Sequence, residues 1–118
     1  MDIPDLNSLP DLRNYLKQKR SDLRNIRQEL ETKHRTKDSK TVKRFKLRLD
    51  QMYLNAKDQL EHLIVGAYCD YQIDKHLAEQ ETNETTRNEL LNQAFNNLTK
   101  RLEHADSEVK LIISGVAS

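Results

Sequence analysis

Apolar residues recur every three or four positions along most of the chain, the spacing that places them on one face of an α-helix. The first stripe has Lys19 at its one polar position. Its apolar members are Leu9, Leu12, Leu16, Leu23, Ile26 and Leu30. Ser8 stands just before the stripe, where its side chain can cap free backbone N–H groups. We therefore predict a first helix over residues 9–32, preceded by a flexible N-terminal arm over residues 1–8.

A second and longer helix is predicted over residues 40–81. Its main apolar stripe consists of Val42, Phe45, Leu49, Met52, Ala56, Leu60, Leu63 and Ala67. Between Leu63 and Tyr71 the helix is apolar nearly all round, because a second apolar set lies off this stripe: Leu47, Tyr53, Leu54, Ile64, Val65, Tyr68 and Tyr71. Such a segment is buried on every side, as the centre of a core or of an oligomer interface. Gly66 costs about 1 kcal/mol relative to alanine in a helix interior, and we expect the helix to continue through it.

A third helix is predicted over residues 87–114. Its apolar stripe consists of Leu91, Phe95, Leu98, Leu102, Ala105, Val109 and Ile112. Thr86 and Glu89 have the spacing of a capping box, which indicates the start of the helix. Gly115 follows the last apolar position and is expected to end it.

These elements predict an all-α fold, in which three long antiparallel helices form a helical hairpin or bundle of coiled-coil character. Residues 9–118 would make a single domain. The helices would be roughly 35, 60 and 40 Å long, so the outer two overlap only near the middle of the second. Each end would then be a two-helix hairpin with a poorly buried stripe, which favours a partner chain. If the second helix instead breaks at Gly66, four shorter helices can close a compact bundle without a partner.

Charge is distributed unevenly, although the net charge is only +1. Residues 1–59 carry 15 Lys/Arg and 9 Asp/Glu, whereas residues 60–118 carry 5 and 10. The densest basic segment, residues 33–48, contains Lys33, Arg35, Lys37, Lys40, Lys43, Arg44, Lys46 and Arg48. Such a segment can bind phosphates, an anionic membrane surface or an acidic protein tail, or it is a solvated hairpin tip. Residues 70–89 are acidic, so the chain is electrically polar along its length and could self-associate head to tail or antiparallel.

Patterns for catalysis, metal binding or cofactor binding are missing from the sequence. Cys69 is the only cysteine, which excludes an internal disulfide. Asp70 and Asp74 share a helix face, but His76 falls on a different one, and two glycines are too few for a phosphate-cradling loop. We therefore expect a protein that is not an enzyme and has no cofactor. With neither a transmembrane segment nor a secretory signal pattern, an intracellular location (cytoplasm or nucleus) is expected.

Two functions remain as hypotheses. The first is a non-enzymatic adaptor or structural subunit, which pairs through its heptad seams with another helical protein or with copies of itself. The residues predicted to contact the partner are Leu60, Leu63, Ile64, Ala67, Tyr68 and Tyr71. The alternative is weak binding of nucleic acid or an anionic surface through the basic tip at residues 33–48. The heptad stripes make the first hypothesis the leading one, and the basic segment supports the alternative.

Overall fold

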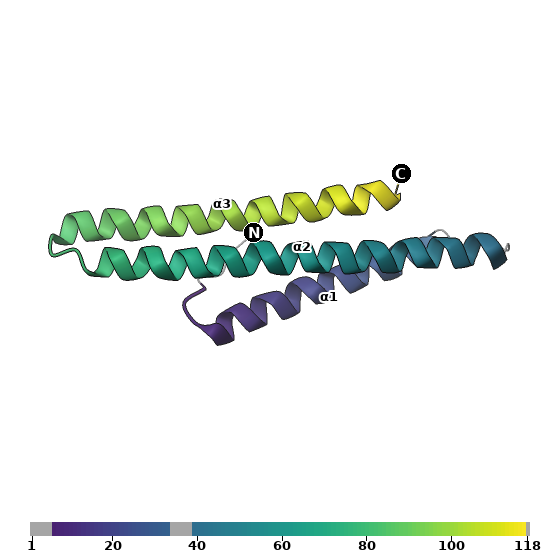
Figure 1. The fold of residues 1–118 in the computed structure, drawn as a ribbon, viewed down its shortest axis with the longest axis horizontal. Helices are drawn as coiled ribbons and strands as arrows, with labels where there is room; N and C mark the ends of the chain where they lie inside the picture. The colour runs from purple at the N-terminus through teal and green to yellow at the C-terminus, as the bar shows by residue number, and fades with distance from the viewer. Residues whose placement is uncertain (1–5, 34–38, 118) are drawn as a thin grey trace.

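The computed structural model describes residues 6–33 and 39–117, and this part of the chain forms three α-helices without any strand. Helix α1 spans Leu9–Lys33, α2 spans Ser39–Glu79 and α3 spans Glu84–Ala117. Both α1 and α3 turn back along α2, and the resulting rod measures 68 × 25 × 20 Å (Figure 1). The predicted all-α fold of antiparallel helices is confirmed.

The predicted start of the first helix and the continuity of the second are also confirmed. At the start of α1, the backbone N–H of Asp11 donates to the Ser8 hydroxyl, with 3.4 Å between nitrogen and Oγ. The backbone N–H of Leu12 donates to the Ser8 carbonyl oxygen at 3.1 Å. Helix α2 runs through Gly66 without a break, so the alternative of four short helices is wrong.

Both predicted ends of the third helix are wrong. The backbone N–H of Thr86 donates to Oδ1 of Asn83 at 3.1 Å, so Asn83 is the cap and Thr86 lies inside α3. The Asn83 side chain caps the free backbone N–H groups at the start of α3, so the helix begins about one turn before the predicted start. At the other end α3 passes through Gly115, which lacks the positive φ by which a glycine ends a helix.

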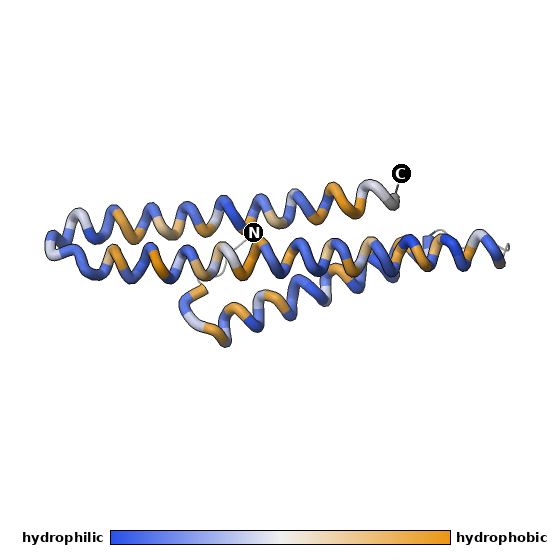
Figure 2. The backbone as a smooth tube through the Cα atoms, in the orientation of Figure 1, coloured by the Kyte–Doolittle hydropathy of each residue, from blue (hydrophilic) through white to orange (hydrophobic). Residues whose placement is uncertain are grey.

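The three helices share one apolar core along the middle of α2. That core includes Leu12 and Leu23 of α1, the α2 positions from Ala56 to Tyr71, and the α3 positions from Ala94 to Val109. Figure 2 shows the apolar positions recurring along all three helices. Several core positions facing each other on α2 and α3 are alanines, and their small side chains allow the two backbones to pack closely: Ala56, Ala67, Ala78, Ala94 and Ala105. The predicted helix lengths gave an overlap of α1 and α3 only near the middle of α2, whereas in Figure 1 the overlap extends along most of α1, because α3 is longer than predicted.

Part of the predicted N-terminal arm packs on the bundle. Leu6 is fully buried in the core, and its carbonyl oxygen accepts a hydrogen bond of 2.8 Å from Nε2 of Gln72. The Lys75 ammonium donates to Oδ1 of Asn7 at 2.7 Å. Leu6 thereby covers the core beyond the start of α1. Residues 1–5 of the predicted arm lie outside the described residues.

Candidate interaction surfaces

The six residues predicted to contact a partner lie in or against the chain's own core: Leu60, Leu63, Ile64, Ala67, Tyr68 and Tyr71. Four are buried, while Leu63 and Tyr68 are half-buried against the same cluster. The prediction that the segment from 63 to 71 is buried on every side is therefore wrong: one side of it lies in the core, while Val65 and Cys69 are exposed on the other side. A partner would reach the core side only by opening the bundle, and that contact stays a prediction.

A different face of α2 carries the apolar surface that the bundle leaves open. Four large side chains are exposed there: Leu47 (69%), Leu54 (55%), Val65 (39%) and Ile73 (58%). They are separated by 7, 11 and 8 residues: the first two steps are close to whole helical turns, and the third places Ile73 about 80° around the helix from Val65. All four therefore lie within one side of the helix. The positions between them on that side are also exposed: Gln51, Asp58, His62 and Cys69. We call these eight residues the outer stripe.

The outer stripe faces away from α3. The buried Ala56 and Ala67 each follow an apolar stripe residue by two positions, which is about 200° around the helix. Sequence reasoning assigned Leu54 and Val65 to an apolar set off the main seam but did not separate them as a solvent-facing line. The seven-residue step from Leu47 to Leu54 was the available signal.

A shallow depression lies at the centre of the outer stripe. Its lining residues are Asp58, Glu61, His62, Val65 and Gly66. Gly66 contributes no side chain, which leaves the helix surface low at this point. Arg101 of α3 borders the same glycine and forms an ion pair with Asp70, one turn further along α2. The depression thus lies among the projecting side chains of the outer stripe.

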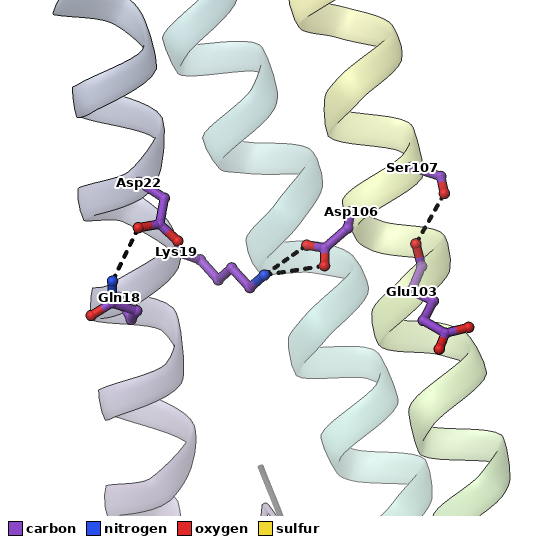
Figure 3. Close-up of polar contacts among 6 residues, drawn as sticks. All are labelled: Gln18, Lys19, Asp22, Glu103, Asp106 and Ser107. Atoms are coloured by element: carbon purple, nitrogen blue, oxygen red, sulfur yellow. Dashed lines mark hydrogen bonds and ion pairs between the residues drawn. The ribbon is translucent and has the colours of Figure 1, made fainter. Parts of the chain in front are cut away.

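One polar pair connects α1 directly to α3 across the core. The Lys19 ammonium lies 2.9 Å from Oδ1 and 3.1 Å from Oδ2 of Asp106, as Figure 3 shows. The Lys19 side chain is only 11% exposed, and its nitrogen lies 5.3 Å from the centroid of the Tyr15 ring. Lys19 is the polar position of the first apolar stripe. The sequence revealed the irregularity but not the partner on α3.

Burial and the neighbouring charges act in opposite directions on the pKa values of Lys19 and Tyr15. Burial alone lowers the pKa of Lys19, but its hydrogen bond to Asp106 and the nearby Tyr15 and Asp106 charges outweigh that effect, so the pKa is raised from 10.5. Burial raises the pKa of the Tyr15 phenol above its ordinary value of 10.0, against the opposing charge of Lys19. At neutral pH the Lys19 amine is therefore protonated, beside a neutral phenol.

The predicted basic tip lies at one end of the rod, where α2 extends beyond the end of α3 (Figure 1). Six of its eight cations are described and all six are exposed: Lys33, Lys40, Lys43, Arg44, Lys46 and Arg48. Arg35 and Lys37 lie outside the described residues. Glu31 contacts Lys46 at 3.4 Å and so offsets one of these cations, whereas Asp50 pairs with Arg27 of α1. The tip still carries more basic than acidic side chains, with Leu47 projecting from its middle.

The opposite end of the rod, at the turn between α2 and α3, is acidic and partly open. Its acids are Asp70, Asp74, Glu79, Glu81, Glu84 and Glu89. A shallow groove between α2 and α3 is lined in part by Leu77 and Leu90, which are 58% and 38% exposed. The charge asymmetry of the sequence thus becomes a rod with one basic and one acidic end.

The described residues include no group of three or more His, Cys, Asp or Glu side chains placed to hold a metal ion. Within the same part of the chain, no helix combines the length and apolar character needed to cross a membrane. No protein-family model, curated protein or solved structure matches this chain. The function of the protein is therefore inferred from the surfaces described above.

Proposed function

We propose that this protein is a non-enzymatic helical interaction protein, an adaptor or structural subunit, that binds another helical chain along the outside of α2. The outer stripe carries the proposal. Single exposed apolar residues are ordinary on a protein surface. Four aligned aliphatic side chains, spanning Leu47 to Ile73 on one helix face, form the kind of seam that a partner helix covers.

The association would leave the three-helix core closed. Covering the stripe removes apolar surface from water at about 25 cal/mol per Å², and this burial supplies the free energy of binding. The charged ends of the rod then select the orientation and partner, because electrostatic complementarity contributes more to specificity than to affinity. This arrangement differs from the predicted contact through residues 60–71, which would require the bundle to open.

Light scattering over a dilution series of the purified chain tests the proposal. We expect a weight-average mass that rises above the 13.9 kDa of one chain as concentration increases. A stripe of this length should pair weakly with itself even if another helical protein is its stronger partner. A mass of 13.9 kDa throughout the series, with a cooperative thermal melt, contradicts the proposal.

A second candidate function is favoured by the exposed cations of the basic tip. Residues 40–48 of α2 carry five Lys/Arg and no acid, and they flank the exposed Leu47. We propose, as the alternative, that this tip binds the phosphates of nucleic acid or of an anionic membrane surface. Its affinity should then fall steeply with salt, in proportion to the number of phosphates contacted.

Charge-removal variants test this alternative with a labelled DNA duplex and with phosphatidylserine vesicles as probes. The variant replaces Lys40, Lys43, Arg44 and Lys46 with glutamine and should abolish binding without changing the melt. The matched control replaces four exposed cations elsewhere with glutamine: Lys17, Arg24, Lys100 and Lys110. If affinity survives in the first variant, or falls equally in both, the tip is not the binding site.

A further inference from the structure

We propose that the chain covering the outer stripe is a second copy of this protein, running antiparallel, with a two-fold axis beside residue 60 of each α2. The inference depends on the proposed function, to which it adds the partner and the register. An isologous interface requires one surface to be complementary to itself. The positions and charges of the stripe meet that requirement.

The outer stripe is nearly symmetric about residue 60. Gln51 and Cys69 lie nine positions on either side of this point, and Leu47 and Ile73 lie thirteen positions on either side. In an antiparallel pair related by this axis, each of these residues faces its counterpart on the other copy. Leu47 therefore contacts Ile73 of the other copy, and the contact is made twice. The exposed aliphatic side chains meet one another instead of meeting charges.

The centre of the stripe fits the same register. Asp58 and His62 lie two positions on either side of the axis, so each carboxylate faces an imidazole of the other copy. Leu54 faces Gly66 and its neighbour Val65, which both line the central depression. The Leu54 side chain therefore arrives at the central depression, beside the Arg101 side chain that borders Gly66.

The charges at the two ends of α2 select the antiparallel orientation. Residues 40–48 carry five Lys/Arg, of which Lys46 pairs with Glu31, whereas residues 70–81 carry Asp70, Asp74, Glu79 and Glu81 with one lysine. Asp70 is paired with Arg101 and Asp74 lines the groove between α2 and α3, so the acidic charge offered to the other copy comes mainly from Glu79 and Glu81. An antiparallel pair places each basic segment beside the acidic segment of the other copy. A parallel pair would place the two basic segments side by side, and such like-charge contacts disfavour an orientation. The dimer is expected to be weak, with a Kd on the order of 10 µM, because its seam is at the small end of interface sizes.

Disulfide cross-linking tests the register with the full chain. The native Cys69 is exposed, and the antiparallel register keeps the two copies of it about 27 Å apart along the helix. Oxidation of the native protein with diamide should therefore give no covalent dimer. Gln51→Cys introduces a thiol opposite Cys69 of the other copy, within the short Cα separation that a disulfide needs. We expect most of that variant to become a covalent dimer, with peptides containing positions 51 and 69 linked by mass spectrometry.

Asn92→Cys serves as the matched control, because Asn92 is exposed on α3 and away from the outer stripe. It should stay monomeric on reducing-agent-free gels under the same oxidation. A covalent dimer of the native chain through its two Cys69 residues would establish a parallel pair and overturn the inference. If Gln51→Cys fails to cross-link although light scattering shows dimers, the inference fails and the proposed function stands. A monomer in both measurements overturns both.

Discussion

The Lys19 ammonium of α1 and the Asp106 carboxylate of α3 form an ion pair of 2.9 Å that links the two helices packed on either side of α2. Lys19 occupies the one polar position of the first apolar stripe and Asp106 lies beside the stripe of α3, so the pair ties α1 to α3 at a fixed position along the rod. Buried ion pairs contribute little net stability, but loss of one partner leaves the other charge poorly solvated. The pair therefore constrains arrangement more than it stabilises the fold.

Removing Asp106 should cost more stability than replacing Lys19 by leucine. We expect Asp106→Ala to lower the free energy of unfolding by about 1–3 kcal/mol, because it leaves the Lys19 ammonium unpaired in a mostly buried position. Lys19→Leu should change it by less than about 1 kcal/mol, because leucine completes the apolar stripe and Asp106 retains contact with water. Urea denaturation measures both values.

Asp22→Ala is the matched control for this pair, because Asp22 is exposed on α1 and its carboxylate accepts a hydrogen bond from Gln18 and makes none with Lys19 in Figure 3. Its effect should stay within about 0.5 kcal/mol, as for most surface substitutions. Equal losses for Asp106→Ala and Asp22→Ala would show that the pair has no special role.

Stability should decrease at alkaline pH through the same cluster. Lys19 and Tyr15 both have raised pKa values in the folded protein, so folding binds their protons more tightly than the unfolded chain does. Their contribution is complete below the unfolded pKa values and is lost as pH rises through the folded ones. Thermal melts of the native chain should therefore decline above about pH 10 more steeply than those of a Tyr15→Phe, Lys19→Leu double variant. Parallel declines would contradict this assignment.

Asn83 should contribute more to the start of α3 than Thr86 does. Asn83→Ala removes the side chain that caps the helix and should cost about 1 kcal/mol. Thr86→Ala places a better helix former inside the first turn and should be neutral or slightly stabilising. Chemical denaturation of the two variants tests the cap. The reverse order of effects would restore the capping box predicted from sequence.

Gly66→Ala should stabilise the chain modestly. Alanine in a helix interior is more stable than glycine by up to about 1 kcal/mol of unfolding free energy. Gly66 has no positive φ that would make alanine strained at this position. The added Cβ would lie 3.1 Å from Nη2 of Arg101, which is the end of a flexible and partly exposed side chain. We expect that guanidinium to shift, and a gain of about 0.5 kcal/mol to remain. A lower thermal midpoint for this variant would show that Arg101 cannot move aside.

The sequence predicted the elements well, because the 3–4 spacing of leucines and alanines is a local property of each helix. The expected helix lengths placed the overlap of the outer helices only near the middle of α2, whereas it extends along most of α1, because α3 is longer than predicted. The spacing could not predict that Lys19 pairs with Asp106, since this contact depends on how α1 and α3 are placed around α2. The start of α3 was mistaken because Asn83 and Thr86 are both good caps, and spacing does not decide between them.

The candidate surface was harder to predict than the fold. Two apolar lines run along α2, one facing α3 and one facing water, and in the sequence they merge into a segment that is apolar all round. Only the packed bundle shows that Ala56 is covered while Leu54, two positions earlier, is not. The docking of Leu6 was missed for a similar reason, because a single leucine before a helix carries no periodic signal.

Sedimentation equilibrium of two matched variants, Leu54→Glu and Leu111→Glu, tests the central claim most directly. Both leucines are exposed, at 55% and 67%, but Leu54 belongs to the outer stripe and Leu111 lies on α3. At the same high concentration, Leu54→Glu should show the 13.9 kDa mass of a single chain, while Leu111→Glu should approach twice that mass, as the native protein does. Equal masses for the two variants would contradict association through the outer face of α2.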